Sequence, residues 1–390
     1  MGRTPLIPAP SCLICGRSEL EGVAAELAPF LKARCAILEP PPIRRSYCPA
    51  CDFSFYDHRL SAEEAGRLYQ DYRGTEYRAL RNRLEPGAAS PLDAHEDRRS
   101  PGNLARIRYA SGLMVKWELR PARVLDYGGE ADGWLARALF PEAEVHTWDL
   151  SSEMPLPPKG AFDLVLCAHV LEHVSFPLSC LEEIRSFLAP GGRLYLEVPY
   201  DPAGPLVATL LEGHPLNRMH EHLSFFSVQA LLRLVTAAGL RPTRCAAVRA
   251  SPHVRSLMVL AEEGGRTSVF PEPDPAEDVC TPILSAAFQR LDAQARHWKA
   301  QGLRVGLYPA GHYGMELLAS TCMGDVVSAL GDGDVSLHGQ VRMGRRIYGA
   351  SELQELGLDI LLVASPLHEE AIARALAFLE RPRVVRASEL

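Results

Sequence analysis

Apolar and polar positions alternate along the middle of the chain with two different periods. Short apolar runs of strand length alternate with segments whose apolar residues recur at helical spacing, as in residues 134–140 and 177–188. The runs that predict strands cover residues 124–125, 144–148, 162–168 and 194–198. Because strands that alternate with helices build parallel sheets, we expect an α/β fold with a Rossmann-like central domain.

The same pattern begins again nearer the C-terminus. A helix is predicted over 283–301, and an apolar run from Leu303 ends in a glycine turn, Gly311–Gly314. Further strands and a helix are predicted over residues 326–330, 359–364 and 368–379. We therefore expect a second Rossmann-like α/β domain, joined to the first by a linker rich in glycine, proline and acids at 261–282. NAD binding is one interpretation of this domain, although its turn is not G-x-G-x-x-G.

The segment ahead of the central domain reads as largely helical. Ser61-x-x-Glu64 has the pattern of a capping box, and residues 103–119 read as an amphipathic helix. The polar, proline-containing segment 81–102 between them is expected to be a loop or lid. An aromatic group either covers a face of the N-terminal module or lines a substrate cleft. Its members are Tyr69, Tyr72 and Tyr77.

Four cysteines form two short pairs near the N-terminus, Cys12-x-x-Cys15 and Cys48-x-x-Cys51. Each short turn directs two sulfurs at one ion, so the four thiolates suit a single tetrahedral zinc with no open coordination position. We expect this zinc to be structural. The alternative interpretation is a pair of redox CxxC motifs, which usually occur singly beside a βαβ unit.

Composition limits the class of protein. The chain has 390 residues, 47% hydrophobic and 23% charged, which is ordinary for a globular protein of two or three domains. Its net charge of −7 and a pI near 6.0 argue against a general nucleic-acid binder. Apolar runs are too short for membrane spans, and the first residues lack a signal-peptide core. We expect a cytoplasmic protein that binds neither nucleic acid nor membrane, with its oligomeric state open.

A glycine-rich turn follows the strand predicted at 124–125. The residues of this turn and of the strand end before it are Asp126, Gly128, Gly129 and Gly133. Glycines let a ligand approach the backbone closely, and the start of the next helix offers free N–H groups. The strand at 144–148 ends in Asp149, a carboxylate placed to accept hydrogen bonds from ribose hydroxyls. This is the pattern of a nucleotide-binding βαβ unit.

A histidine-rich segment follows the strand predicted at 194–198. His220, Glu221 and His222 are expected on a loop at the carboxyl end of the parallel sheet, where ligands bind. Imidazole titrates near neutrality, so these residues are candidate general bases. They could instead anchor the loop, and a metal site is disfavoured because adjacent positions do not face one side. His169, which follows the preceding strand, could contact cofactor or substrate or simply shape its loop.

Several of these motifs, in this order, resemble the class I S-adenosylmethionine (SAM) dependent methyltransferases. The motifs are Asp126-x-Gly128-Gly129, Asp149, His169–His173 and Gly191–Pro199. The resemblance implies that the glycine turn and His169 lie at the SAM site and that Asp149 holds the ribose. The family turn is D-x-G-x-G-x-G, whereas Glu130 occupies the position of the middle glycine here. The segment between Asp149 and Phe162 is about half the usual length.

The order of the parts over nearly the whole chain resembles the zinc-containing C-methyltransferases of nucleotide-linked keto-deoxysugars. That family has a Tyr-x-Glu-His segment at its reaction centre; here the segment reads Met219-His220-Glu221-His222. The resemblance implies that His222 is the base, with His220 and Glu221 orienting it or binding substrate. It also implies three parts: a zinc-binding module at 1–75, a SAM-dependent methyltransferase domain at 76–262, and a substrate-binding Rossmann-like domain at 283–390.

The resemblance therefore implies an enzyme that removes a proton next to a ketone and transfers the SAM methyl group to the carbon of the resulting enolate. Its expected cofactors are SAM and structural zinc, and its partner is a small molecule or a nucleotide-sugar. Three alternatives remain. They are an O- or N-methyltransferase of a small molecule or glycan precursor, an RNA base methyltransferase, and a non-catalytic binding protein derived from a methyltransferase. The altered glycine turn favours the last, and the acidic balance argues against the second.

Overall fold

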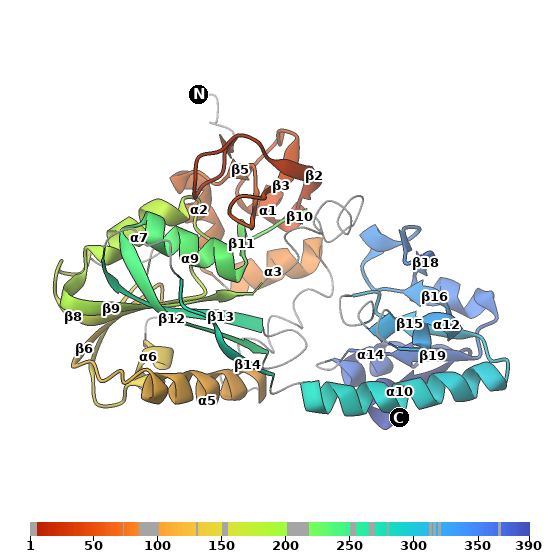
Figure 1. Ribbon diagram of the computed structural model, residues 1–390. Helices are drawn as coiled ribbons and strands as arrows, with labels where there is room; N and C mark the ends of the chain where they lie inside the picture. The colour runs from red at the N-terminus through yellow and green to blue at the C-terminus, as the bar shows by residue number, and fades with distance from the viewer. Residues whose placement is uncertain are drawn as a thin grey trace. The chain divides into compact units, whose positions relative to one another are not determined.

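The computed structural model describes most of the chain and divides it into two compact units (Figure 1). The first unit contains Met1–Tyr77 and Pro101–Glu277, and the second contains Arg78–Ser100 and Asp278–Leu390. The described residues are 6–72, 74–85, 101–129, 132–149, 155–200, 218–249, 255–264, 270–278, 281–311, 314, 317–318, 321–365 and 368–390. None of the helices in this described part is long and apolar enough to cross a membrane.

A seven-stranded sheet forms the centre of the first unit, with the strand order β14-β12-β13-β9-β8-β6-β7. The strands are β6 (Arg123–Tyr127), β7 (Glu144–Trp148), β8 (Phe162–Ala168), β9 (Leu188–Pro199), β12 (Leu240–Arg249), β13 (Arg255–Glu263) and β14 (Asp274–Asp278). Strands β7, β6, β8 and β9 pair in parallel, whereas β13 is antiparallel to both β9 and β12. The α/β class predicted from the sequence is confirmed.

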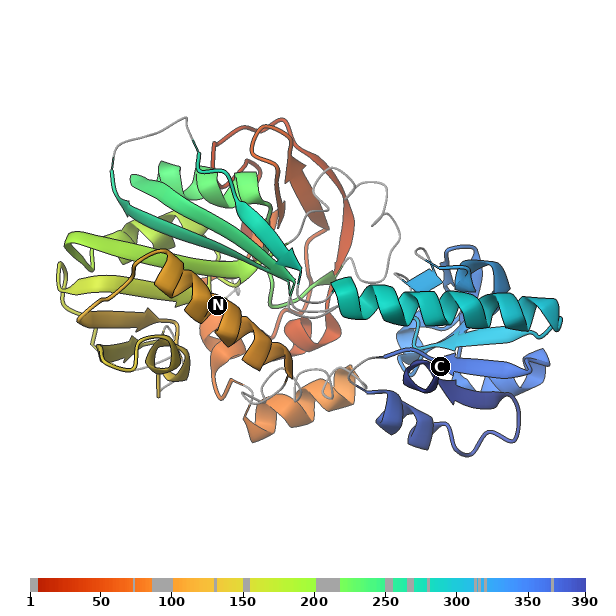
Figure 2. The same ribbon diagram turned by 60° about the horizontal axis from the view of Figure 1, so that its bottom comes forward.

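Helices cover both faces of this sheet, as Figures 1 and 2 show. One face carries α5 (Pro101–Lys116) and α6 (Trp134–Leu139), and the other carries α7 (Pro177–Arg185) and α9 (Val228–Ala237). Successive strand residues point to opposite faces, so Val124 packs in the core beneath α5 and α6 while Leu125 packs beneath α7 and α9. Burial on both faces explains why these strands read as continuous apolar runs.

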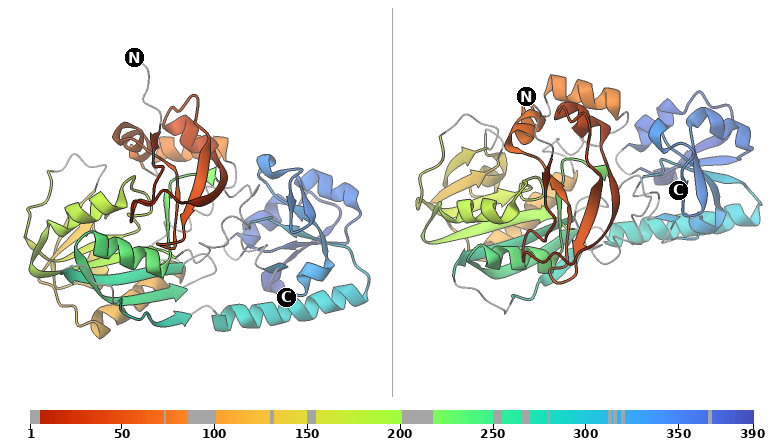
Figure 3. Two further views of the ribbon diagram at one scale, coloured as in Figure 1. Left: turned by 45° about the horizontal axis from the view of Figure 1, so that its top comes forward. Right: turned by 90° about the horizontal axis from the view of Figure 1, so that it is seen from above.

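The N-terminal segment with the four cysteines builds a second sheet in the same unit (Figure 3). Its order is β10-β2-β3-β4-β11, and its strands are β2 (Glu21–Leu27), β3 (Ile43–Cys48), β4 (Phe53–Tyr56), β10 (Arg218–Met219) and β11 (Ser224–Phe226). The two outer strands come from the histidine-rich segment after β9. That segment therefore completes the N-terminal sheet, with β10 parallel to β2 and β11 antiparallel to β4.

Shorter elements surround this sheet. They are the pair β1 (Ile7–Pro8) and β5 (His58–Arg59), and the helices α1 (Pro29–Arg34), α2 (Ala62–Tyr69) and α3 (Thr75–Leu84). The predicted capping box begins α2, because Ser61 and Glu64 exchange side-chain to backbone hydrogen bonds of 3.2 and 2.8 Å. Most of the predicted loop at 81–102 lies outside the described residues.

Two elements differ from the sequence expectation. Strand β9 begins at Leu188 rather than at residue 194, because Leu188 pairs with Phe162 before the register shift at the glycines. Strand β14 occupies part of the segment expected to be a linker. It lies at the end of the large sheet, where the Asp274 carboxylate accepts hydrogen bonds from Lys116 (2.7 Å) and Trp117 (3.1 Å).

The second unit is a separate α/β fold with the strand order β17-β18-β16-β15-β19-β20. Its strands are β15 (Val305–Tyr308), β16 (Val327–Gly331), β17 (Val341–Arg342), β18 (Arg345–Tyr348), β19 (Ile360–Val363) and β20 (Arg383–Arg386). Its helices are α10 (Thr281–Ala300), α12 (Met323–Val326), α13 (Ala350–Leu353) and α14 (Glu369–Ala375), with 3₁₀ turns at Val335–Leu337, Gln354–Leu356 and Ala387–Glu389. Its pairs are parallel except β17–β18, as the repeated strand–helix pattern predicts.

Candidate active site

The predicted glycine turn lies where β6 ends and α6 begins. Gly128 has φ +77°, and a Cβ there would lie 2.4 Å from Val170 Cγ2. Gly133 has φ +57°, and its Cβ would lie 2.6 Å from Thr147 Cγ2. Both the left-handed backbone and the lack of space therefore require glycine at these positions. The Gly128 N–H donates to the Trp148 carbonyl (2.7 Å), which draws the turn against the end of β7.

The two acids predicted beside this turn lie at different depths. Asp126 is buried beneath it, and a Cβ on Gly129 would lie 2.6 Å from Asp126 Oδ2. Asp149 is half-buried and directly follows β7, whose residues pair in register with those of β6. The structure therefore brings the glycine turn and Asp149 to one edge of the sheet. Glu130, the departure from the family turn, lies outside the described residues.

His169 follows β8 at the same edge and has a left-handed backbone with φ +57°. Such a conformation is uncommon for residues other than glycine and is found preferentially at functional sites. The His169 ring lies between two buried carboxylates, with Nδ1 3.3 Å from Glu172 Oε1 and Nε2 3.3 Å from Glu197 Oε1. Burial and Arg106 would lower the pKa of His169, but the two carboxylates raise it. The geometry therefore favours a protonated His169.

Glu197 of β9 fixes the other side of that ring. Its side chain is 1% exposed and accepts two hydrogen bonds from Arg106, at 2.6 and 3.0 Å, and one from Tyr195 Oη at 3.3 Å. Burial alone would raise the pKa of Glu197, but the charges of Arg106 and His169 and their hydrogen bonds hold it below its usual range. Glu197 is therefore an anion that orients His169.

Glu172, His173 and His222 form a compact cluster beside His169. One donor atom from each of the three lies within 4.8 Å of the others. His173 Nε2 is 3.8 Å from Glu172 Oε1, and the His173 and His222 rings meet edge to face with centroids 4.7 Å apart. Among the described residues, no donor makes a well-aligned hydrogen bond to either carboxylate oxygen of Glu172. Nearby imidazoles instead stabilise this carboxylate by charge.

The local electrostatics give Glu172 and His222 different charges at neutral pH. Burial opposes ionisation of Glu172, but contact with His169 and the charges of the surrounding histidines lower its pKa to about 2. Burial and the neighbouring His173, opposed by Glu172, lower the pKa of His222 to about 3. The His222 side chain is nevertheless partly exposed to solvent. It is therefore a partly exposed imidazole that is neutral at physiological pH.

The other two predicted catalytic residues, His220 and Glu221, contact different partners. The ring of His220 stacks on Phe30 at 5.6 Å, and its Nδ1 accepts a hydrogen bond from the Glu221 N–H (2.9 Å). The Glu221 side chain is largely buried, while its backbone carbonyl accepts the Nδ1–H of His173 at 3.1 Å. Glu221 thus fixes the tautomer and orientation of His173 rather than those of His222.

The tyrosines link the N-terminal module to the histidine cluster through ring contacts. Tyr77 packs against Phe30 (4.8 Å) in the N-terminal module, and Tyr72 lies between Tyr77 and Tyr69. Tyr69 meets the ring of His173 edge to face at 6.1 Å. Its hydroxyl is buried and has no hydrogen-bond partner in the described part of the chain. Burial first, and then nearby anionic groups, raise the pKa of Tyr69 well above its usual value, so the hydroxyl stays a donor.

The four N-terminal cysteines converge, with their Sγ atoms within 4.8 Å of one another. Cys15 and Cys48 sulfurs are 3.8 Å apart, and the Ile14 N–H lies 3.5 Å from Cys12 Sγ. Gly16, at φ +74°, closes the first turn with a hydrogen bond to the Cys12 carbonyl (2.9 Å). Four thiols at these separations fit the tetrahedral donor set that zinc prefers.

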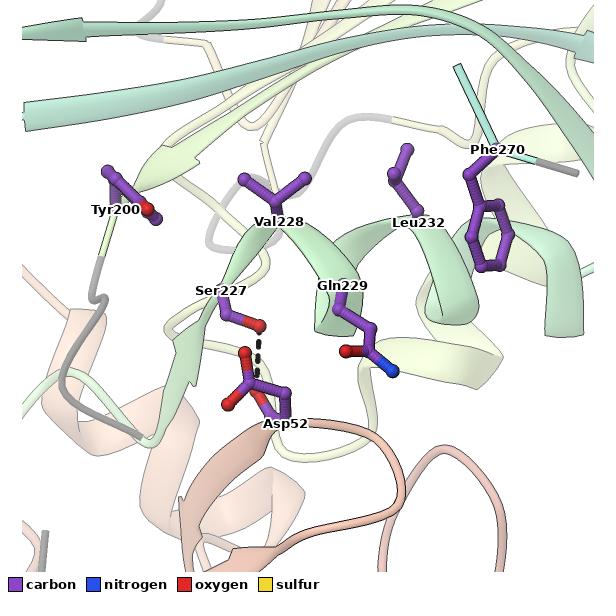
Figure 4. A pocket seen from close by; sticks show the side chains of 7 residues that line it. All are labelled: Asp52, Tyr200, Ser227, Val228, Gln229, Leu232 and Phe270. Carbon is purple, nitrogen blue, oxygen red and sulfur yellow. Dashed lines mark hydrogen bonds between the residues drawn. The ribbon is translucent and has the colours of Figure 1, made fainter. Parts of the chain in front are cut away.

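A hollow of about 390 Å³ lies at the start of α9 and is shown in Figure 4. Ser227, which caps this helix, also donates to the Asp52 carbonyl (2.8 Å) and so joins α9 to the cysteine turn. The lining residues are Asp52, Tyr200, Ser227, Val228, Gln229, Leu232 and Phe270. None of these is a predicted site residue, so this hollow is distinct from the histidine cluster.

Sequence reasoning missed part of the site. Glu172 and His173 lie in the motif that supported the resemblance, but neither was assigned a role. Arg106 gave no signal, because its partner Glu197 lies on a strand far from it in the sequence. The one available signal for Glu172 and Glu197 was an acid within or beside an apolar strand, which requires a buried partner.

Comparisons with known proteins identify a methyltransferase domain in the chain. Residues 69–244 match the family described as "Methyltransferase domain". A ubiquinone biosynthesis O-methyltransferase of Xanthomonas euvesicatoria pv. vesicatoria is 32% identical over 173 residues, which cover 36% of this chain and 70% of that protein. The corresponding protein of Chromobacterium violaceum is 33% identical over 97 residues, 24% of this chain but only 40% of that relative's length.

Solved structures also align with the chain. A Burkholderia thailandensis 1,6-didemethyltoxoflavin-N1-methyltransferase is 19% identical, with a TM-score of 0.37, over 56% of this chain and 96% of that one. The N-methyltransferase NodS of Bradyrhizobium japonicum WM9 is 13% identical, with a TM-score of 0.33, over 45% and 96%. The Xanthomonas relative, 32% identical over 70% of its length, shows the family: the chain belongs to the class I SAM-dependent methyltransferases.

Proposed function

We propose that this protein transfers a methyl group from SAM to a carbon next to a ketone, in a keto-sugar nucleotide or a related small molecule. The observation that carries the proposal is the partly exposed imidazole of His222, which meets the His173 ring edge to face beside the buried Glu172 carboxylate. A carbon becomes nucleophilic only after it loses a proton, and a neutral imidazole can accept that proton. Glu172 then stabilises the imidazolium that forms.

A base with a pKa of about 3 is weak, so the developing enolate oxygen needs a strong hydrogen-bond donor. Tyr69 supplies one, because its buried hydroxyl has no partner among the described residues and stays protonated. His169 adds a fixed positive charge between Glu172 and Glu197. In this arrangement His222 accepts the proton while Tyr69 stabilises the oxygen.

The glycine turn and Asp149 support SAM as the methyl donor. Gly128 and Gly133 leave no room for a Cβ where the backbone faces the carboxyl ends of β6 and β7. Asp149 directly follows β7, and its proposed role is to accept hydrogen bonds from the ribose hydroxyls. When bound, SAM supplies an electrophilic methyl group. Zinc, held by the four cysteines, would have a structural role, because four thiolates leave no open position.

The C-terminal α/β domain is proposed to bind the nucleotide part of the substrate. Gly311 follows β15, and Asp332 follows β16 at the same carboxyl edge. The Asp332 carboxylate accepts hydrogen bonds from the N–H groups of Ala310 (3.0 Å) and Asp334 (2.9 Å), which shapes the turn after β15. Crevices at this edge of parallel sheets are the usual ligand positions.

The test has two stages. Calorimetry on zinc-loaded protein should detect SAM binding that Asp149→Ala removes; no binding by the folded wild type would support a non-catalytic binding protein. Nucleotide-linked keto-sugars incubated with the protein in D₂O should then exchange the proton next to the ketone for deuterium. His222→Ala should lose this exchange. His146→Ala should keep it, because His146 lies on β7 and its side chain pairs with Glu144 rather than with the histidine cluster.

O-methylation is the second candidate, because the curated relatives are O-methyltransferases. The same imidazole could take a hydroxyl proton, and Tyr69 could orient the acceptor. The exchange experiment separates the two reactions, since O-methylation needs no C–H cleavage. Methyl transfer to a hydroxyl without any exchange would overturn the carbon-acceptor proposal and keep His222 as the base.

A further inference from the structure

Arg59 of β5 is the most completely enclosed charged side chain in the described part of the chain, with 0% exposure. Its guanidinium donates only to neutral oxygens, and the nearest of them come from two separate loops. On the first loop, Arg59 Nε donates to Ser175 O (2.8 Å) and Nη2 to Val174 O (2.9 Å). On the second, Nη1 donates to Leu223 O (2.6 Å) and Nη2 to Ser224 Oγ (2.8 Å).

These two loops carry the histidines of the candidate site. Val174 directly follows His173, and Leu223 directly follows His222. The same loops touch each other through the Glu172 carbonyl, which accepts hydrogen bonds from the N–H groups of Leu223 (2.7 Å) and Ser224 (3.1 Å). One guanidinium from the N-terminal module therefore spans the place where the two imidazoles meet.

We propose that Arg59 is a positioning residue that sets the separation and orientation of His173 and His222. The inference rests on the proposed role of His222 as the base. It assigns to the cysteine-bearing module a part in the reaction beyond that of a structural domain. Arg59 does not touch substrate; it acts through the backbone of the two loops.

Arginine is required by the geometry. Its planar group offers five N–H donors in a fixed fork, so one side chain can hold acceptors on both loops at once. A lysine ammonium has three donors around one atom and cannot span the same oxygens. Burial lowers the pKa of Arg59 to about 9, which still leaves it a cation at neutral pH. The carbonyl dipoles of the two loops are what stabilise that buried charge.

Neighbouring bonds make this connection rigid. Ser175 Oγ donates to the Leu60 carbonyl (2.6 Å), and the Tyr56 N–H donates to the Leu223 carbonyl (3.1 Å). Strand β11 then continues as an antiparallel partner of β4. Each histidine loop is thus tied to the module at a second point, and displacement of Arg59 would change the distance between the loops rather than release both.

The test compares Arg59→Lys with Arg45→Lys in the zinc-loaded, full-length protein. Arg45 is a matched control because it is a buried arginine of the same module whose side chain contacts Ser54 (3.0 Å) and Phe225. NMR of the histidine rings at neutral pH gives a readout independent of turnover. We expect the ring signals of His173 and His222, whose edge-to-face contact the two loops hold, to shift in Arg59→Lys and to stay unchanged in Arg45→Lys.

Kinetics provide the second readout. A misplacement of about 1 Å can cost roughly 10²-fold in rate, so Arg59→Lys should lower kcat by about that factor while the SAM affinity stays within about twofold. Guanidinium added to Arg59→Ala should restore part of the rate. Unchanged ring signals of His173 and His222 in Arg59→Lys, or equal losses of SAM affinity in both lysine variants, would overturn the proposal. If no ketone substrate turns over, the ring signals alone still decide the role of Arg59, whereas the function proposal fails separately.

Discussion

The ion pair between Arg106 and Glu197 is the most informative place to perturb the fold beneath the site. Glu197→Gln keeps the shape of the side chain but removes the charge that faces Arg106, Tyr195 and His169. The Glu197 side chain is 1% exposed and that of Arg106 11%, so solvent cannot replace the lost partner. Breaking a buried pair by changing one member costs about 3–5 kcal/mol. We expect Glu197→Gln to lose about this much stability at pH 7.

The assay is urea unfolding followed by tryptophan fluorescence, since Trp117 packs against Tyr195 with ring centroids 6.4 Å apart. With a slope of about 2–3 kcal/mol/M, the midpoint should fall by about 1–2 M. The double variant Arg106→Met Glu197→Gln leaves no unpaired arginine and should lose less than the sum of the single changes. Glu370→Gln breaks an exposed helical pair in the second unit and should leave the midpoint unchanged.

The pH dependence gives the sign of the effect. The pKa of Glu197 in the folded protein lies below its ordinary value of 4.5, so the pair stabilises the protein fully above that pH and less as pH falls. The difference between wild type and Glu197→Gln should therefore be largest near neutrality and shrink below about pH 4. Additive losses in the double variant, or a difference independent of pH, would refute the assignment of a coupled buried pair.

Three further outcomes follow from the site. Because the pKa of His222 is about 3, kcat/KM should show no acid limb near pH 6.5 that belongs to His222, as checked by comparing the pH profile with that of His222→Gln. Co²⁺ added to zinc-loaded protein should inhibit methyl transfer, because Glu172, His173 and His222 can ligate it. The His222 lone pair would then bind the metal and could not accept a proton. Activation by Co²⁺ would contradict the role of His222 as the base. Gly133→Ala should weaken SAM binding at least tenfold by calorimetry, since its Cβ would lie 2.6 Å from Thr147 while the protein retains its zinc.

Local sequence patterns predicted many of the turns and helix ends that the structure contains. The strand–turn–helix unit with Gly128, Gly133 and Asp149 depends on residues close together in sequence, and it appears as expected. The same holds for the two CxxC turns, which converge because the first precedes β2 and the second begins at the end of its antiparallel neighbour β3. The Ser61–Glu64 box is equally local, and its reciprocal hydrogen bonds are present.

Local sequence patterns did not predict which side chains make up the candidate site. His222 was singled out because of its neighbours in the sequence, yet its ring partner is His173. The N–H groups of Leu223 and Ser224 donate to the Glu172 carbonyl and so bring the two histidines together. The buried Glu172 and the Arg59 connection depend on the same long-range register. Tertiary packing sets such contacts, and a one-dimensional pattern of apolar residues carries no information about them.

The five-stranded sheet has a consequence for how the chain must fold. Strands β2, β3 and β4 leave the ribosome early, but both of their outer neighbours, β10 and β11, belong to residues 218–226. Until that segment is synthesised, both edges of the N-terminal sheet lack their native pairing, and such edges invite association with other chains. The cysteine module therefore cannot mature ahead of the domain that follows it. An exchange of this module between relatives would have to carry β10 and β11 with it.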